Sequence, residues 1–220
     1  FTGSLKGGNA LSRLAAERAQ PIPVFAEMSS INPVILLPEA LQARGDNIAR
    51  DLSASVVMGC GQFCTNPGLI LGLRSPAFSA FVEQFKAHMA DQPAQTMLNR
   101  GTLASYRKGL EHLRTHPGVR HLAGSAQGDH QAQPQLFQAD ISLLLGGDEL
   151  LQEEVFGPAT VLIEVADAQQ LAAAIQALRG QLTATLIGEA HELPNWGWLG
   201  ELLQEKVGRV LLNGYPTGVE

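Results

Sequence analysis

The amino-acid sequence predicts an α/β fold with a mostly parallel sheet flanked by helices. Short apolar runs of strand character alternate with amphipathic stretches of helical period, as in "ATVLIEV", "AQQLAAAIQAL" and "LTATLIG". The run "PVILLP" is apolar throughout and lies between prolines, which is typical of a strand buried on both faces of a sheet. Hydrophobic residues make up 45% of the 220-residue chain and charged residues 16%, a balance that favours a large buried core.

The first half of the chain predicts three helices and three strands. A helix over 10–19 has apolar residues at helical spacing, and prolines follow it. A helix over 75–90 carries stronger signals, with Ser75 as N-cap, Pro76 in the first turn and phenylalanines along one face. A long helix is expected over 39–58, and β-forming apolar runs predict strands at 22–28, 33–38 and 68–74.

The second half continues the alternation. An amphipathic helix is expected over 102–116, where Pro117 and Gly118 close it. The polar stretch 124–135 predicts an exposed loop or hairpin. Further strands are expected at 159–165, 182–188 and 209–213, with helices at 168–178 and 198–207.

Composition and charge narrow the classes of protein. The net charge is −6 and no basic run is present, which argues against nucleic acid or an anionic membrane as a partner. No uninterrupted apolar run reaches the roughly 18 residues of a membrane-spanning helix. Two cysteines are too few for a disulfide framework, so a reducing, cytoplasmic location is expected. The chain lacks an initiator Met and a signal-peptide pattern, and we interpret it as an interior piece of a longer protein.

Both cysteines of the chain, Cys60 and Cys64, lie in "GCGQFCTNPG". Their CxxxC spacing differs from the CxxC redox motif, and no second cysteine pair completes a zinc site. Inert packing is the ordinary interpretation, since free cysteine is among the most buried residue types. The polar neighbours of Cys64, together with the glycines, instead suit a thiolate stabilised by nearby backbone N–H groups.

Other polar residues admit both a structural and a functional interpretation. Ser4 follows "FTG" and is either a simple helix N-cap or part of a phosphate-binding helix start. Glu27 ends an apolar run and is either a structural acid or a general base. Glu153 and Glu154 precede an aromatic residue and a Gly-Pro turn in "EEVFGP". They are either a solvated pair or an acid that binds a sugar diol beside a ring.

Two of the six histidines, His112 and His116, have HxxxH spacing on a predicted helix. No third ligand accompanies them, so a solvated helix face is expected and no metal site is predicted.

The order of these motifs resembles that of the aldehyde dehydrogenase superfamily. "FTGS", "PVFAEMSS", "GQFCTNPG", "EEVFGP" and "LNG" follow one another in the family's running order, over essentially the whole chain. "EMSSINPV" replaces the commoner E-L-G-G-K-x-P of the family, and "NGYPTGV" stands near the end. These features look like the branch that contains α-ketoglutaric semialdehyde (2,5-dioxopentanoate) dehydrogenases and an NADP-dependent fatty aldehyde dehydrogenase.

The resemblance implies a role for each matching residue. Cys64 matches the nucleophile, which forms a thiohemiacetal and then a thioester, and its backbone N–H matches half of an oxyanion hole. Glu27 matches the general base that activates the hydrolytic water. Ser4 matches the cap of the helix beneath the cofactor pyrophosphate. Glu154 and Phe156 match the acid on the nicotinamide ribose and the ring beside it. Cys60 has no catalytic counterpart.

The resemblance also implies a domain division and partners. Residues 1–28 are expected to end a Rossmann-like dinucleotide-binding domain, as its last helix–strand unit, and residues 29–220 to form the catalytic domain. NADP or NAD is the expected cofactor, and the whole protein is expected to be a homodimer or homotetramer. The expected substrate is α-ketoglutaric semialdehyde. The alternatives are a fatty aldehyde or, in another class, a non-catalytic α/β interaction domain with inert cysteines. The family's oxyanion asparagine and adenosine contacts are expected upstream of this chain, which alone is expected to be inactive.

Overall fold

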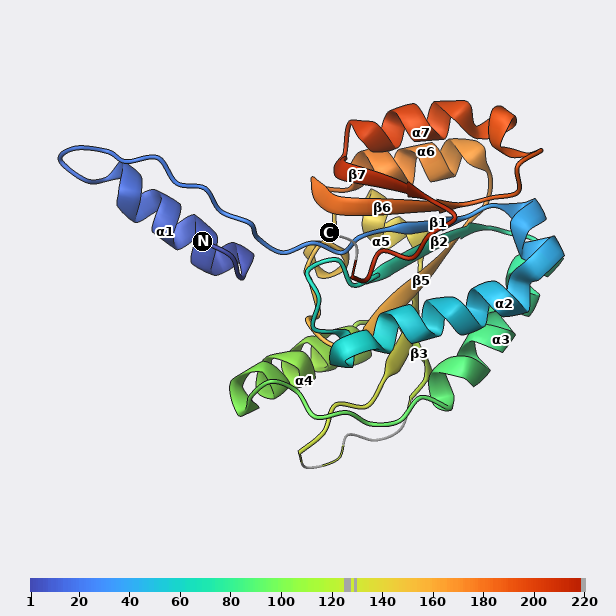
Figure 1. Ribbon diagram of the computed structural model, residues 1–220, viewed down its shortest axis with the longest axis horizontal. Helices are drawn as coiled ribbons and strands as arrows, with labels where there is room; N and C mark the ends of the chain where they lie inside the picture. The colour runs from blue at the N-terminus through green and yellow to red at the C-terminus, as the bar shows by residue number, and fades with distance from the viewer. Residues whose placement is uncertain (125–127, 129, 219–220) are drawn as a thin grey trace.

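The computed structural model describes residues 1–124, 128 and 130–218. Within them, seven strands form one sheet in the order β3-β4-β5-β2-β1-β6-β7 (Figure 1). Neighbouring strands are parallel except for β3 and β4, which are antiparallel. The strands are β1 (Val34–Leu36), β2 (Leu69–Leu73), β3 (Val119–Ala123), β4 (Gln135–Ala139), β5 (Ala159–Val165), β6 (Gln181–Ile187) and β7 (Val207–Leu212). The predicted α/β class with a mostly parallel sheet is therefore confirmed.

Helices cover both faces of this sheet. Helices α2 and α3 share one hydrophobic cluster with one face, and α4 to α7 share another cluster with the opposite face. No helix in the described ranges has both the length and the apolar character needed to cross a bilayer. The α-helices are α1 (Leu5–Ala16), α2 (Pro38–Val57), α3 (Pro76–Ala90), α4 (Arg100–Thr115), α5 (Ile141–Leu145), α6 (Ala168–Ala177) and α7 (Gly197–Gln204).

The central strand β1 explains why its sequence is apolar throughout. Val34 and Leu36 belong to the cluster under α2 and α3, whereas Ile35 belongs to the cluster under α4 to α7. Successive side chains of a strand point to opposite faces, so a strand covered on both sides needs apolar residues at every position. All three residues are fully buried, as the sequence predicts.

Helix α3 follows its sequence signals closely. The Ser75 hydroxyl accepts a hydrogen bond from the Phe78 N–H at 3.0 Å, and Pro76 occupies the first helical position. Phe78, Phe81 and Phe85 are buried and stack along one face. Burial of each such ring contributes about 1.5–3 kcal/mol, which ties α3 firmly to the sheet.

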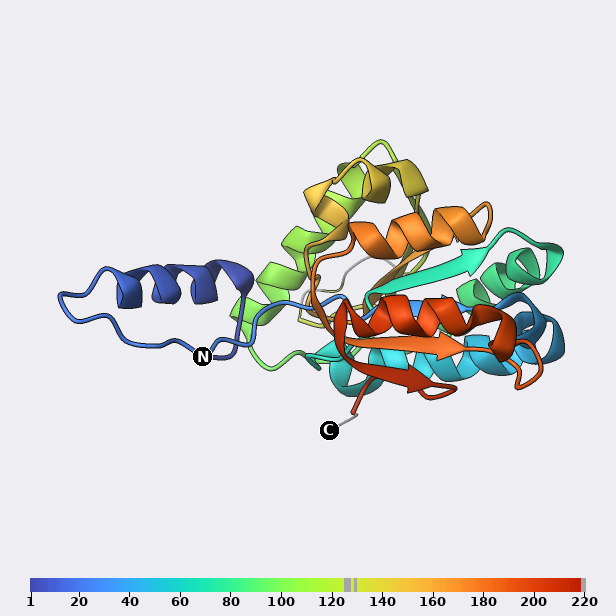
Figure 2. The ribbon, with the colours of Figure 1, turned by 90° about the horizontal axis from the view of Figure 1, so that it is seen from above.

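The strand expected at 22–28 is wrong. This segment forms only an isolated parallel bridge between Thr2 and Glu27, with a hydrogen bond from the Glu27 N–H to the Phe1 carbonyl at 2.9 Å. Phe25 is 85% exposed, because no neighbouring strand or helix of the described residues covers it. Figures 1 and 2 both show α1 and this segment standing apart from the sheet.

Smaller differences also separate the sequence prediction from the structure. Strands β3 and β4, which flank the polar stretch 124–135, pair in antiparallel fashion, as the hairpin alternative predicts. Residues 125–127 and 129 of that stretch lie outside the described part of the chain. Helix α2 is not continuous, since Arg44 has non-helical backbone angles (φ −147°, ψ 33°). Strands β3 and β4 and the short α5 were not expected as elements.

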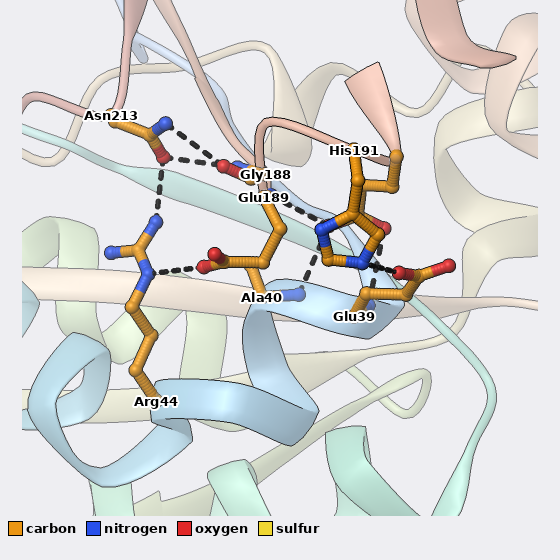
Figure 3. Close-up of polar contacts among 8 residues, drawn as sticks. Glu39, Ala40, Arg44, Gly188, Glu189, His191 and Asn213 are labelled. Carbon is orange, nitrogen blue, oxygen red and sulfur yellow. Dashed lines mark hydrogen bonds and ion pairs between the residues drawn. The ribbon is translucent and has the colours of Figure 1, made fainter. Parts of the chain in front are cut away.

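A polar cluster at the carboxyl ends of β1, β6 and β7 explains the kink in α2 (Figure 3). The Arg44 guanidinium contacts the Glu189 carboxylate at 2.7 Å and the Asn213 side-chain oxygen at 2.7 Å. Asn213 in turn pairs with the backbone of Gly188 at 3.1 and 2.8 Å. The buried Glu192 carboxylate caps α2 by accepting from the Ala40 N–H at 2.9 Å. These bonds fasten the segment after β7 to α2 and β6.

Candidate active site

The five residues singled out in the sequence line one cleft of about 730 Å³. Three of its segments lie ahead of β1, β2 and β5, which are parallel, so their amino ends meet at one edge of the sheet. Ligands of open parallel sheets usually bind at the carboxyl ends of the strands. This cleft instead lies at the amino ends, on the opposite edge of the sheet. The five residues are Ser4, Glu27, Cys64, Glu154 and Phe156.

Cys64 reaches the cleft because the chain turns sharply after α2. Gly59, Cys60 and Gly61 all have positive φ angles, between 55° and 63°, within a short 3₁₀ segment. At Gly61 a side chain is also excluded by space, since a Cβ would lie 2.2 Å from the carbonyl carbon of Gly157. The turn leaves Cys64 exposed and Cys60 buried.

The two thiols therefore have different surroundings. Cys60 is 2% exposed, and its sulfur lies 3.7 Å from the Gln95 carbonyl oxygen. Burial raises the pKa of the Cys60 thiol, which disfavours the reactive thiolate. The packing interpretation of Cys60 is thus confirmed by its place in the core.

The Cys64 thiol lies beside the Glu27 carboxylate in the cleft. Partial burial raises the pKa of this thiol, and the negative charges of Glu27 and Glu154 raise it further. The cysteine is consequently held as a thiol with a carboxylate in place to accept its proton. This is the arrangement of a nucleophile beside a base.

The two acids before Phe156, Glu153 and Glu154, differ in their burial. Glu154 is half-buried and lines the cleft, whereas Glu153 is exposed. Burial raises the pKa of Glu154 to about 7, against the opposing effect of a hydrogen bond from the Ser29 hydroxyl. Phe156, 36% exposed, adds an aromatic face to the same cleft.

The start of α1 forms another wall of the cleft. The Ser4 hydroxyl caps the helix by accepting from the Gly7 N–H at 3.2 Å, as the structural interpretation predicts. The Leu5 N–H donates to the Ser29 hydroxyl at 3.2 Å. Ser29 also lies beside Glu154, where it lowers the pKa of that acid, so one residue adjoins both the positive end of this helix and the acid.

The HxxxH histidines lie away from this cleft. His116 pairs with Asp148 at 3.2 Å and accepts from the Gly118 N–H through its other ring nitrogen. In the part of the chain that the structure describes, no group of three or more His, Cys, Asp or Glu side chains could hold a metal ion.

Comparison with known proteins identifies the family of the chain. The model of the aldehyde dehydrogenase family matches residues 1–219. The chain belongs to the aldehyde dehydrogenase family. The resemblance inferred from the motif order is therefore confirmed.

Two curated members of the family are similar over the whole chain. The α-ketoglutaric semialdehyde dehydrogenase of Acinetobacter baylyi is 53% identical over 222 residues. The α-ketoglutaric semialdehyde dehydrogenase 2 of Azospirillum brasilense is 46% identical over 222 residues. The chain is covered completely in both comparisons and spans 42% of the length of each relative.

Solved aldehyde dehydrogenase structures share the fold. An NAD-dependent benzaldehyde dehydrogenase from Corynebacterium glutamicum matches with a TM-score of 0.79 and 19% identity, over 99% of this chain and 47% of that one. The glyceraldehyde-3-phosphate dehydrogenase GapN from Methanocaldococcus jannaschii, in complex with NADP, matches with a TM-score of 0.78 and 19% identity, over 100% and 46%. The first of these proteins is named NAD-dependent, and the second was solved with NADP.

Sequence reasoning about this aldehyde dehydrogenase chain missed several residues of the cleft. Ser29 stands where the commoner family motif has glycine, and it had no assigned role. The first turns of α4 also line the cleft, although the sequence of that helix signals only amphipathicity. A signal for Ser29 was present, because a polar residue that replaces a motif glycine adds a hydrogen-bonding group. The residues from α4 are Gly101, Thr102 and Ser105.

Proposed function

We propose that the whole protein oxidises an aldehyde to a carboxylic acid with NAD or NADP, using Cys64 as nucleophile. The observation that carries the proposal is the exposed Cys64 thiol beside the Glu27 carboxylate, in a cleft that also holds Glu154. A non-catalytic domain with inert cysteines would not require an exposed thiol beside an acid.

In the proposed first step, Glu27 accepts the thiol proton and the Cys64 sulfur bonds to the aldehyde carbon. The carbonyl oxygen becomes an oxyanion, which the Cys64 backbone N–H stabilises as one of two donors. Loss of a hydride from the resulting thiohemiacetal carbon leaves a thioester on Cys64. Glu27 releases its first proton to solvent, and as a carboxylate again it takes a proton from water as that water attacks the thioester carbon. The carbon–sulfur bond breaks, the acid leaves, and the sulfur regains a proton.

The residues of the cleft fit a dinucleotide. The start of α1 offers N–H groups and the positive end of a helix dipole to a pyrophosphate, with Ser4 as its cap. Glu154 would accept hydrogen bonds from the hydroxyls of the nicotinamide ribose, and the Phe156 ring would pack beside it. When bound, NAD or NADP supplies the acceptor for the hydride.

The proposed substrate is α-ketoglutaric semialdehyde, because the two curated relatives carry that activity in their names at 53% and 46% identity. Exposed apolar side chains on residues 1–28, such as Phe25 at 85% and Leu14 at 62%, support a boundary after residue 28. We assign residues 1–28 to the end of a dinucleotide-binding domain and residues 29–220 to the catalytic domain. A cytoplasmic homodimer or homotetramer is the proposed form of the whole protein.

The test is an assay of the whole protein with α-ketoglutaric semialdehyde and either NAD or NADP, followed by the absorbance of the reduced nicotinamide. A Cys64→Ser variant should lose turnover, whereas the matched Cys60→Ser variant should keep it. Absence of turnover in the wild type with both cofactors would contradict the proposed reaction. Turnover that survives Cys64→Ser would contradict the assigned nucleophile.

A further inference from the structure

Asn32 lies just before β1, and its side chain is completely buried. Its backbone is in the left-handed region with φ 44°, a conformation that asparagine tolerates better than most residues. A buried amide in such a conformation must have all its polar atoms satisfied, so its partners indicate its purpose.

The Asn32 side chain joins the cysteine loop to the sheet. Its Nδ2 donates to the Cys64 carbonyl oxygen at 2.9 Å and to the Asn66 carbonyl oxygen at 2.9 Å. Its Oδ1 accepts from the Ser30 hydroxyl at 2.8 Å and from the Thr183 hydroxyl of β6 at 3.0 Å. The donors thus face the loop that carries Cys64, and the acceptor faces Ser30 and β6, which lies between β1 and β7 in the sheet.

The same loop is fastened to the segment that carries Glu154. The Asn66 side-chain Nδ2 donates to the Gly157 carbonyl oxygen at 3.2 Å. The backbone of Gly61 packs directly on Gly157, where no side chain would fit. A single hydrogen-bonded path therefore runs from β6 through Asn32 and the cysteine loop to the residues that follow Glu154.

We propose that Asn32 is a positioning residue for Cys64: its amide fixes the backbone carbonyl of the cysteine, so that the thiol lies beside Glu27. This inference rests on the proposed function, since it assigns Asn32 to the same nucleophile. Cys64 lies on an irregular loop, and its exposed side chain makes too few packing contacts to hold it in one position. Displacement of a reacting atom by about 1 Å can cost about 10²-fold in rate, so a fixed carbonyl at this residue matters for the chemistry.

The test compares Asn32→Gly with a matched control in the whole protein. Glycine adopts a positive φ freely, so the variant removes the amide without straining the backbone. The control is Thr185→Val on the same strand β6, which removes a buried hydroxyl that has no hydrogen-bond partner among the described residues and leaves the bonds of Asn32 in place. The readout is the pH dependence of Cys64 alkylation by iodoacetamide, with and without Glu27→Gln in each background.

In the otherwise wild-type protein, Glu27→Gln should move the midpoint of the alkylation profile to lower pH, because it removes a negative charge beside the thiol. In the Asn32→Gly background the same change should have little effect, since the thiol no longer lies beside residue 27. The Thr185→Val background should behave like the wild type, and kcat should fall about 10- to 100-fold in Asn32→Gly alone. An equal Glu27→Gln shift in all three backgrounds would overturn the inference, as would a Thr185→Val effect as large as that of Asn32→Gly.

If Asn32→Gly fails to fold, Asn32→Asp replaces it. Aspartate keeps the left-handed backbone and the acceptor toward Thr183, but its ionised carboxylate cannot donate to the Cys64 carbonyl. A loss of kcat of at least about tenfold with little change in the KM for the cofactor is expected, and an unchanged kcat would contradict the role. Alkylation needs neither aldehyde nor cofactor, so a wild type that oxidises no aldehyde would overturn the proposed function and leave the Asn32 test readable.

Discussion

Cys64 and Glu27 come from separate segments, and their contact gives the cleft its chemistry. The cysteine lies on the loop before β2, and the acid lies in the segment between α1 and β1. Burial and the nearby carboxylate raise the pKa of the thiol, which favours a protonated sulfur at rest, and Glu27 lies beside it as a base. A base in this position can serve twice, first for the thiol and then for water.

Glu27→Gln in the whole protein should slow thioester hydrolysis more than thioester formation. Glutamine keeps the shape of the side chain but cannot accept a proton, and general-base catalysis contributes about 10²–10⁴-fold. The same change removes the negative charge that raises the pKa of the Cys64 thiol, so the thiolate can form by loss of its proton to solvent. Stopped-flow kinetics should therefore show a retained burst of reduced cofactor followed by slow turnover. Loss of the burst itself would indicate that Glu27 is needed mainly to activate the thiol.

Glu154 predicts a pH dependence of cofactor binding. Its pKa of about 7 in the free protein is raised by burial, so the ionised fraction increases as the pH rises through neutrality. The carboxylate accepts hydrogen bonds from ribose hydroxyls better than the neutral acid does. The Kd for NAD or NADP, measured by calorimetry between about pH 6 and about pH 8, should therefore fall as the pH rises. The Glu154→Gln variant should lose this trend, and an unchanged trend in the variant would assign it to another group.

At the scale of elements, the turn between α2 and β2 is what presents the cysteine. Gly61 combines a φ of 63° with backbone contact to Gly157 that excludes a Cβ. This glycine is therefore needed both for conformation and for space.

Gly61→Ala should lower the free energy of unfolding by about 2–4 kcal/mol, from a left-handed backbone and an overpacked contact. Gly200→Ala is a matched control, since Gly200 lies inside α7 and a Cβ added there would meet no neighbouring atom within 4 Å. The control should stabilise the protein by up to about 1 kcal/mol. Thermal or urea unfolding measures both, and similar effects of the two substitutions would contradict the assigned packing.

Much of the element order could be predicted because local signals agree with the tertiary structure. Ser75 and Pro76 mark the start of α3, and the unbroken apolar run marks the doubly covered β1. The strand prediction at 22–28 rested on residues that favour a strand. It failed because a strand also needs neighbouring strands to pair with, and among the described residues this segment forms only an isolated bridge. The kink at Arg44 depends on Glu189 and Asn213, which are distant in sequence, and so has no local signal.

The candidate site shows the same division. Cys64, Glu27 and Glu154 stood out because their residue types and neighbours are unusual for a core. Asn32 did not stand out, because an asparagine before a proline also fits an ordinary turn. Its partners from β6 and from the cysteine loop are visible only in three dimensions.

For the whole molecule, the 220 residues alone are expected to show no aldehyde oxidation. The chain spans 42% of the length of its curated relatives, and residues 1–28 expose apolar side chains on α1 and the segment after it. With one proposed oxyanion donor missing, the rate should fall by a further ~10²–10³-fold. An assay with aldehyde and NAD or NADP checks this, and turnover on the order of 1–10³ s⁻¹ would contradict the proposed domain boundary.

The central claim is that one cysteine of the pair is the reactive nucleophile and the other belongs to the core. Limited alkylation of the native whole protein with iodoacetamide, followed by peptide mapping and assay of the remaining activity, tests it most directly. We expect the label on Cys64, in proportion to the activity lost, with Cys60 unmodified until the protein is denatured. Preferential labelling of Cys60, or full labelling of Cys64 with activity retained, would contradict this assignment.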